Sequence, residues 1–412
     1  MTRRTEVVVV GAGLMGAATA WQLARRGHGV TLIEAYGIGH RRGSSHGTSR
    51  IFRRAYADPF YVELTGRAEA RWRELEDDTG TALLRTTGGL DLGAERDPAG
   101  LAAVLGAAGV ECALLGAWEA AERWPFIHFD GPALYHPRAG VIDADAAVAA
   151  SVRRAAALGA EVLTGTRVRG IAARGDGRAA VRIGEGEAER EGAGKVRGAG
   201  REEAEIVADA VVVAAGAWLP ELAPEIGVPG GGGGDSGGGG GGLGLPPLTV
   251  TQQQVFHFAQ RDPGAAWPVL VAKDALQLFG LPSGADGGPV PAVKVAQHND
   301  GTPTSATARS GVVDPVSRAT VARWVARSLP GLDPRPVAES TCLYTTTPDE
   351  DFVLDRVGPV VVVSPCSGHG AKFAPLIGAM AADLALGEAR AHPRFALRRG
   401  LQHVPIQSET RR

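Results

Sequence analysis

The sequence predicts an α/β fold with two sheets of different kinds, and three stretches of its 412 residues carry this prediction. Residues 7–10 form an apolar, β-branched run, followed by a glycine turn and an Ala/Leu-rich helical pattern to Arg26, an order typical of a parallel βαβ unit. Residues 248–295 alternate short β-like segments with Gly/Pro turns, which predicts a mostly antiparallel sheet. Residues 360–364 form another buried strand, followed by a glycine turn and a helix over 374–386.

The glycine turn after the first strand has the spacing Gly11-x-Gly13-x-x-Gly16. In such a turn the first glycine permits the tight bend, the second lets the backbone approach a pyrophosphate, and the third lets helix and strand pack closely. A second strand, 30–34, ends in Glu34, whose carboxylate can accept from a ribose hydroxyl. Together these features predict a Rossmann-like dinucleotide-binding unit. The alternative is a Gly-rich βα turn that holds no ligand.

Composition excludes several classes of partner. A net charge of −2 gives no argument for binding nucleic acid or a membrane surface. The sequence has no run of 18 uncharged apolar residues, so no membrane span is expected. The three widely spaced cysteines (Cys112, Cys342, Cys366) argue against a disulfide framework and favour a reducing, cytoplasmic compartment. The sequence contains no CxxC or HExxH pattern, so a metal site is not expected. The Met-Thr-Arg-Arg start is not expected to be a secretory signal, since cleavage would remove the first strand and its glycine turn.

The remaining elements follow in chain order. The periodic patterns predict a helix over 61–79, two short strands in 83–92, a helical region over 96–123, short strands in 135–142, a helix over 146–158 capped by Asp143, strands at 160–163 and 166–168, a buried strand over 210–218, and a short helix over 321–329. Residues 185–205 are charged and poor in apolar residues, which predicts an exposed insertion. Residues 229–244 hold eleven glycines between Gly230 and Gly242 and are expected to be a flexible insertion.

Two further stretches are chemically dense. Residues 40–56 form a Gly/Ser loop with many cations, and charge alone leaves two interpretations open: a solvated basic loop, or arginines that face a phosphate or a carboxylate. The turn at Gly368-His369-Gly370 precedes a helical pattern, so it predicts a second anion site with Lys372 on the first turn of the helix.

Five motifs in one order carry a family resemblance that covers nearly the whole chain. They are Gly11-x-Gly-x-x-Gly16 with Glu34; Gly43-Ser-Ser-His-Gly-Thr-Ser-Arg50-Ile-Phe-Arg53-Arg-Ala-Tyr56; Lys294-x-x-x-His298; Cys342-Leu-Tyr344-Thr-x-Thr; and Ser367-Gly-His-Gly-x-Lys372-Phe. The sequence resembles the monomeric sarcosine oxidase family of flavoprotein amine oxidases, which includes N-methyltryptophan oxidase.

The resemblance implies FAD held in a p-hydroxybenzoate-hydroxylase-like fold of two domains. The FAD-binding domain would comprise 1–88, 145–228 and 345–395, and the substrate domain 89–144 and 245–344, with 229–244 as the insertion. The resemblance and the small-residue turns together place these residues beside the cofactor: Gly11, Gly13, Gly16, Glu34, Ser44, His46, Arg50, Val168, Gly216, Trp218, Cys342, Gly368, His369, Gly370 and Lys372.

Catalytic roles are also implied by the resemblance. Cys342 would be the thioether attachment to the flavin, its alternative being a buried core cysteine. Arg53 and Lys372 would clamp a substrate carboxylate, and Lys294 would promote reoxidation by oxygen unless it is a strand lysine that faces solvent. His298 and Tyr344 would orient the substrate.

The implied reaction is oxidation of a secondary-amine amino acid, such as sarcosine or another N-methyl or cyclic imino acid. A hydride would leave the substrate carbon for flavin N5, water would hydrolyse the imine, and oxygen would become hydrogen peroxide, in a monomeric enzyme. Phe279 stands where the family has a mobile tyrosine, so the substrate is left open. Two alternatives remain: a flavin dehydrogenase or biosynthetic flavoprotein on the same scaffold, and an NAD-dependent dehydrogenase, which residues 7–34 alone would fit.

Overall fold

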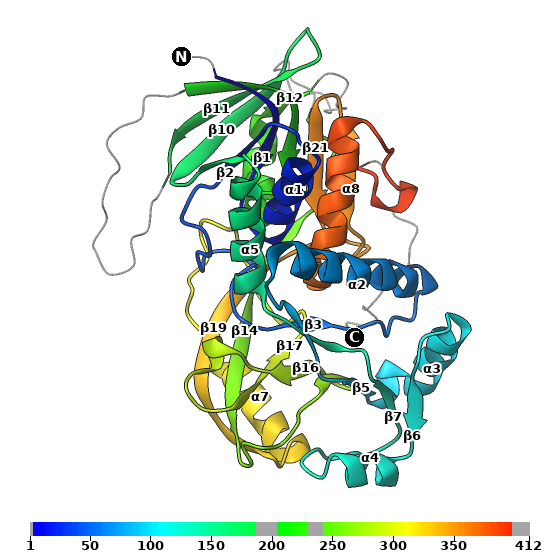
Figure 1. The fold of residues 1–412 in the computed structure, drawn as a ribbon. Coiled ribbons are helices and arrows are strands. Elements are labelled where there is room, and N and C mark those ends of the chain that lie inside the picture. Colours follow the sequence, from blue (N-terminus) through cyan, green and yellow to red (C-terminus); the bar gives the residue numbers. More distant parts are fainter. Residues whose placement is uncertain (1–2, 187–203, 229–241, 398–412) are drawn as a thin grey trace.

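The computed structural model describes residues 3–186, 204–228 and 242–397. These residues form two parts, each built on a nine-stranded sheet, and the two parts lie one above the other in Figure 1. The α/β fold class with a second, mostly antiparallel sheet is therefore confirmed. The two predicted insertions, 185–205 and 229–244, fall largely outside the described residues.

The first sheet is built around the valine run. Val7 to Val10 are buried, with β2 and β12 paired in parallel on either side, which explains why the run is apolar on both faces. The order along the sheet is β13-β10-β11-β12-β1-β2-β9, with β21 also paired to β12 and β20 to β21. Its strands are β1 (Arg3–Val10), β2 (Val30–Ile33), β9 (Glu161–Leu163), β10 (Thr166–Ala173), β11 (Ala179–Glu185), β12 (Ala204–Val213), β13 (Ile226–Gly227), β20 (Val353–Val357) and β21 (Val360–Ser364).

Helices cover this sheet. α1 (Leu14–Arg25) packs between α5 (Ala144–Ala157) and α8 (Ala374–Leu386), and α2 (Pro59–Thr79) crosses the end of α8, as Figure 1 shows. Small residues allow the close approach of α1 and α8, because a Cβ at Gly378 would lie 2.6 Å from the carbonyl carbon of Ala18. Asp143 Oδ1 accepts from the N–H of Ala146 at 2.9 Å, which confirms the predicted cap of α5.

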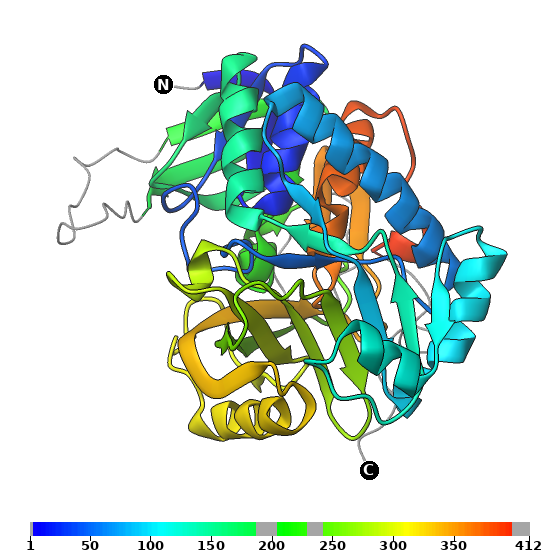
Figure 2. The ribbon, with the colours of Figure 1, turned by 60° about the horizontal axis from the view of Figure 1, so that its bottom comes forward.

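The second sheet has the order β18-β14-β17-β16-β15-β5-β7-β6, with β19 also paired to β14. Its pairs are antiparallel except β5 with β15. α7 (Pro315–Ser328) packs against β14, β17 and β19, as Figure 2 shows. The strands are β5 (Gly89–Leu92), β6 (Ala113–Leu115), β7 (Ala133–His136), β14 (Thr249–Gln260), β15 (Val269–Lys273), β16 (Gln277–Pro282), β17 (Ala292–Gln297), β18 (Thr302–Pro303) and β19 (Leu332–Thr346).

A small third sheet joins β3 (Arg50–Phe52), β8 (Gly140–Ile142) and β4 (Leu84–Thr86). It places the end of the basic loop next to β4 and β8, which precede α3 (Pro98–Ala107) and α5 in the chain, respectively. No helix in the described ranges has both the length and the apolar character needed to cross a membrane.

The prediction of one helical region over 96–123 is wrong, because a strand separates two helices there. The chain forms α3 (Pro98–Ala107), then β6, then α4 (Ala117–Arg123), because Gly109 takes a left-handed φ of +66° and turns the chain after α3. β19 was not predicted as a strand either. The apolar/polar alternation typical of a strand is obscured there by Pro334, Pro336 and many exposed positions. Pairing with β14 makes the segment a strand despite its low local β propensity.

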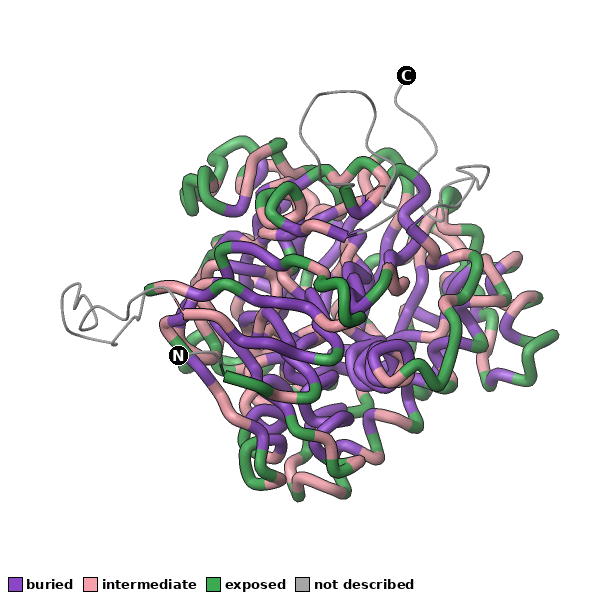
Figure 3. The backbone as a smooth tube through the Cα atoms, turned by 90° about the horizontal axis from the view of Figure 1, so that it is seen from above, coloured by how far each residue is buried: buried purple, intermediate pink, exposed green. Residues whose placement is uncertain are grey.

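The buried residues run through the interior of the molecule, as Figure 3 shows from above. One of them, Trp72 of α2, is fully buried, and its indole N–H donates to the carbonyl oxygen of Lys372 at 2.7 Å. A helix of the first part therefore fixes the turn that carries a predicted site residue.

We expect Trp72→Phe to lower the free energy of unfolding by about 1–3 kcal/mol, because it leaves the buried Lys372 carbonyl without its donor. Denaturant titration measures this change. Trp118, which is 75% exposed, is the matched control, and its change to Phe should cost less than about 0.5 kcal/mol. Equal effects of the two substitutions would contradict the role given to the Trp72 hydrogen bond.

Candidate active site

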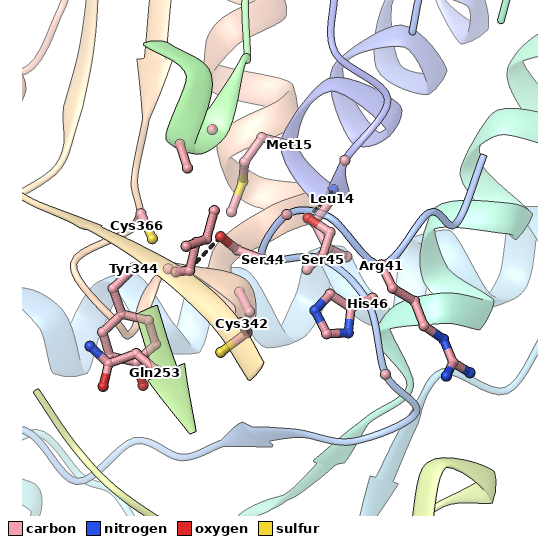
Figure 4. A pocket seen from close by; sticks show the side chains of 18 of the residues that line it. Leu14, Met15, Arg41, Ser44, Ser45, His46, Gln253, Cys342, Tyr344 and Cys366 are labelled. Carbon is pink, nitrogen blue, oxygen red and sulfur yellow. Dashed lines mark hydrogen bonds between the residues drawn. The ribbon is translucent and has the colours of Figure 1, made fainter. Parts of the chain in front are cut away.

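A cavity of about 1090 Å³ lies where the two parts meet. Its wall comes from the glycine turn, the basic loop, strands β14, β16, β17 and β19, and the turn before α8. Every residue predicted for the site lines it except Gly16. A Cβ at Gly16 would lie 1.8 Å from the Gly11 carbonyl oxygen, so this glycine is required for close packing of α1 on the turn. Figure 4 shows Leu14 and Met15 of α1 opposite Cys342 and Tyr344 of β19.

Glu34 fixes the shape of the glycine turn. Its carboxylate accepts from the backbone N–H of Ala12 at 2.8 Å and of Tyr36 at 2.9 Å. Burial opposes its ionisation, but the hydrogen bond and charge of His40 and these N–H groups hold the pKa of Glu34 below its ordinary value. The carboxylate is thus charged at the cavity wall, as its predicted contact with a ribose requires.

The basic loop is neither fully solvated nor fully free for a ligand. The Arg50 guanidinium donates hydrogen bonds within the loop, to the carbonyl oxygens of Ser44 at 3.0 Å, His46 at 2.5 Å and Ser49 at 2.8 Å. Ser44 Oγ donates to the Leu343 carbonyl at 2.5 Å and ties the loop to β19. Arg50 therefore holds the loop in shape at the cavity wall and adds positive charge there.

His46 is neutral in this loop. Burial, followed by the positive charges of Arg50, Arg309 and Lys294, lowers the pKa of His46 to about 3. Its Nε2 is a buried atom with no hydrogen-bond partner among the described residues. A neutral imidazole that faces the cavity can donate to or accept from a polar ligand.

Lys294 of β17 is buried, with 4% of its surface exposed, so the alternative of a solvent-facing strand lysine is wrong. Its ammonium donates to Asp286 Oδ2 at 2.9 Å and to the Ser49 carbonyl at 3.2 Å. Burial and the charge of Arg50 lower the pKa of Lys294 to about 8, and Asp286 opposes this shift.

Arg53 and Lys372 converge on one tyrosine. Lys372 Nζ donates to Tyr56 Oη at 2.9 Å and to the His369 carbonyl at 2.6 Å, while the Arg53 guanidinium lies 4.5 Å from the centre of the Tyr56 ring. Arg53 also donates to the Ala55 carbonyl. Burial and the charge of Arg53 hold the pKa of Lys372 well below its ordinary value. Both side chains thus lie close to the Tyr56 ring and out of bulk water.

The sequence predicts Lys372 on the first turn of the helix, and this prediction is wrong. Lys372 lies in the 3₁₀ turn Gly370–Phe373, and α8 begins at Ala374. Gly370 packs directly on the Pro365 carbonyl, whose oxygen is 1.4 Å from where a Cβ would be, so a larger residue does not fit at the start of this turn. The Lys372 side chain is aimed across the cavity wall toward Tyr56 and not along the axis of α8.

A hydrogen-bond chain continues from Tyr56. Its hydroxyl lies 3.2 Å from His369 Nδ1, and His369 Nε2 lies 3.2 Å from the Glu350 carbonyl. A carbonyl can only accept, so Nε2 carries the proton and Nδ1 accepts from Tyr56. Burial raises the pKa of Tyr56 to about 12 and lowers that of His369, so both groups are neutral.

Cys342 and Tyr344 lie on β19, where Cys342 pairs with Gln253 of β14. Cys342 and Cys366 are free thiols, and burial raises the pKa of each. Cys366 Sγ accepts from the Thr345 N–H at 3.2 Å, and Tyr344 Oη lies 3.5 Å from His298 Nδ1. Figure 4 shows Cys342, Tyr344 and His46 around the same cavity.

The cavity fits a dinucleotide. Four buried polar atoms on its wall, besides His46 Nε2, have no partner among the described residues: Ser49 Oγ, Trp218 Nε1, Gln253 Oε1 and Ser364 Oγ. Buried polar atoms normally have partners, so these atoms indicate a bound polar group. The glycine turn adds a cradle that a side chain would fill, since a Cβ at Gly13 would lie 2.9 Å from Ser45 Oγ.

Several residues of the wall were not singled out from the sequence. Asp286 lies in a Gly-rich turn, and the only available signal was an acid eight positions before Lys294. Arg309 donates to the Arg42 carbonyl at 2.8 Å and brings a loop of the second part onto the basic loop. No sequence period marks such a loop-to-loop contact.

Comparisons with known proteins agree with this geometry. Residues 6–384 match the family described as FAD dependent oxidoreductase (DAO). A monomeric sarcosine oxidase of Streptomyces avermitilis is 32% identical over 410 residues, covering 95% of this chain and 96% of the relative. An N-methyl-L-tryptophan oxidase of Yersinia pestis is 27% identical and covers 92% and 94%. The solved structure of NikD, an unusual amino acid oxidase essential for nikkomycin biosynthesis, superimposes with a TM-score of 0.78 at 26% identity, covering 96% and 97%.

Proposed function

This chain belongs to the FAD dependent oxidoreductase family, as a sarcosine oxidase-like member, and we propose that it oxidises a secondary-amine amino acid with oxygen as the acceptor. The substrates proposed are sarcosine and other N-methyl or cyclic imino acids. The observation that carries this proposal is the pair of buried cations, Arg53 and Lys372, on the cavity wall.

The groups that accept from these two cations are neutral. They are the Tyr56 hydroxyl and the carbonyls of Ala55 and His369. The buried carboxylate of Asp91 acts on Arg53 but is itself paired with Arg96. Buried positive charge is costly unless an anion pairs with it, and two basic side chains around one tyrosine suit a carboxylate. The carboxylate of an amino acid substrate would complete this site and fix the orientation of its amine end.

The cofactor and three further residues would carry out the remaining steps of the proposed reaction. Bound in the cavity, FAD would supply the redox chemistry, accepting two electrons from the substrate and passing them to oxygen. His298 and Tyr344 form a polar pair on the same wall, and burial raises the pKa of Tyr344 strongly, so its hydroxyl stays protonated and can donate. The Lys294 ammonium stabilises negative charge that develops on oxygen.

The test is a panel of sarcosine, N-methyl amino acids and cyclic imino acids, with hydrogen peroxide and anaerobic bleaching of the flavin measured for each. We expect at least one compound to give both signals, and a matched amine without the carboxylate to be at least about 100-fold poorer. Bleaching without peroxide in air would favour the flavin dehydrogenase or biosynthetic alternative. Absence of both signals throughout the panel would refute the proposed substrate class.

We also propose that Cys342 carries the flavin through a thioether. Its thiol is free, partly buried and on the cavity wall, and Cys342 pairs with Gln253 of the neighbouring strand β14. Acid precipitation of the purified protein should leave the flavin in the pellet, whereas Cys342→Ser should release it into the supernatant.

Cys366→Ser is the matched control, because Cys366 is also free and partly buried but accepts from the backbone N–H of Thr345. It should keep the flavin in the pellet. Release of flavin from the unsubstituted protein would contradict the attachment at Cys342.

A monomeric state and a cytoplasmic location complete the proposal. Three free cysteines, none of them in a disulfide, support a reducing compartment. Light scattering should give a mass near 42.5 kDa, and a mass of twice that value would overturn the monomer.

A further inference from the structure

A carboxylate from a turn of the second sheet faces the Lys294 ammonium. The turn Ala285–Gly287 lies between β16 and β17, and Asp286 Oδ2 accepts from Lys294 Nζ at 2.9 Å. The other oxygen of the same carboxylate accepts from Thr48 Oγ1 at 2.5 Å. Thr48 Oγ1 in turn accepts from the backbone N–H of Asp286 at 3.1 Å. The two reciprocal hydrogen bonds fix the carboxylate so that one oxygen is aimed at the lysine.

Glycines on both sides keep this contact tight. A Cβ at Gly47 would lie 2.9 Å from Asp286 Oδ2, and one at Gly284 would lie 2.3 Å from Thr48 Oγ1. The basic loop of the first part and the turn of the second part therefore meet without intervening side chains. Asp286 and Lys294 lie eight positions apart in a turn and the next strand, whereas Thr48 lies 238 positions from Asp286 and is brought to it by the fold.

The charges around Lys294 give Asp286 a specific role. Arg50 repels the ammonium, while His46 and His257 are neutral, since burial comes first among the causes that lower their pKa values to about 3 and about 4. Burial raises the pKa of Cys342, which is thus a neutral thiol. Of the groups that favour the charged form of Lys294, Asp286 has the largest effect, and its carboxylate is negative at neutral pH because Lys294 and Thr48 keep its pKa low against burial.

We propose that Asp286 is a positioning residue for Lys294: its carboxylate, oriented by Thr48, holds the ammonium at the cavity wall and offsets the repulsion from Arg50. This inference rests on the oxygen-reactive role of Lys294 in the proposed function. It predicts that removing one negative charge from the turn changes the pH at which Lys294 loses its proton, and with it the pH range of the reaction with oxygen.

The chain is well suited to a direct test, because it contains only four lysines, Lys195, Lys273, Lys294 and Lys372. In the holoenzyme labelled with ¹³C and ¹⁵N in lysine, NMR titration follows each side chain, and Lys294→Met identifies the Lys294 signal. Asp286→Asn should move the Lys294 titration, which lies at about 8 in the unsubstituted protein, to lower pH by about one to two pH units. Thr48→Val, which keeps the charge but removes the orienting hydroxyl, should move it in the same direction by less.

Stopped-flow reoxidation gives the second measurement. Asp286→Asn should react with oxygen about tenfold more slowly near pH 7.5 and regain the unsubstituted rate at lower pH, because Lys294 is then protonated in both proteins. Asp274→Asn is the matched control, since Asp274 accepts from the Ala94 N–H at a surface turn and should alter neither profile. A Lys294 titration that is the same with and without the Asp286 charge would overturn the inference. A Lys294→Met protein that reoxidises normally would instead refute the oxygen role, while the NMR shift would still report the pairing.

Discussion

Replacing Lys294 with methionine is expected to slow reoxidation of the reduced enzyme by oxygen about 10²–10³-fold, while reduction by substrate changes little. The reason is that a buried ammonium, 4% exposed and held by Asp286 and Ser49, supplies fixed positive charge where oxygen gains negative charge. Stopped-flow spectroscopy separates the two half-reactions.

The same experiment has a pH dependence with a defined sign. Burial brings the pKa of Lys294 down to about 8, so the fraction of charged lysine falls as the pH rises through that value. The oxygen rate constant of the unsubstituted enzyme should fall over the same range, and the methionine variant should lack this step. Equal rate constants for the two proteins below pH 7 would show that Lys294 does not act on oxygen.

Replacing Arg53 with glutamine is expected to lower kcat/KM for carboxylate-bearing substrates by about 10²–10³-fold, which corresponds to about 2.7–4 kcal/mol of lost transition-state stabilisation. Arg53 is 6% exposed and lies against Tyr56, where Lys372 also donates, so its charge has little water to screen it. Steady-state kinetics with the substrate found in the panel measures the loss.

Two comparisons make the Arg53 result specific. The preference for the substrate over its analogue without a carboxylate should shrink by a similar factor, because only the carboxylate uses this charge. Arg54→Gln is the matched control: Arg54 is the next residue, but its guanidinium donates to the Val62 carbonyl on α2, and its loss should change kcat/KM by less than about threefold. An unchanged carboxylate preference in Arg53→Gln would reject the clamp.

Much of the first sheet was predictable, because its signals are local. Four consecutive β-branched valines favour a strand that is buried on both faces, and the glycine spacing after them is typical of a dinucleotide-binding turn. The helices α1, α2, α5 and α8 were also predicted, since each has an apolar period, and Asp143 marks the start of α5. Strand β19 escaped prediction because its pairing with β14 depends on residues about eighty positions away.

The candidate site shows the same division. The residue types came from the motifs, and the fold brings them around one cavity, but the contacts between them could not be predicted from the sequence. Tyr56 and Lys372 are separated by 316 positions and meet through one hydrogen bond. Asp286 had no pattern to mark it, since a turn residue in a Gly-rich loop has no period.

The sequence by itself therefore determined the dinucleotide turn, the kinds of sheet and the family, because these depend on backbone preferences and periods that each segment carries alone. Only the tertiary structure decided which charges stand together and which partners they have. It buried Lys294 against Asp286 and placed Arg53 and Lys372 around Tyr56. The physical reason is that burial and pairing, which set the pKa and the orientation of a side chain, are properties of the neighbours that folding supplies.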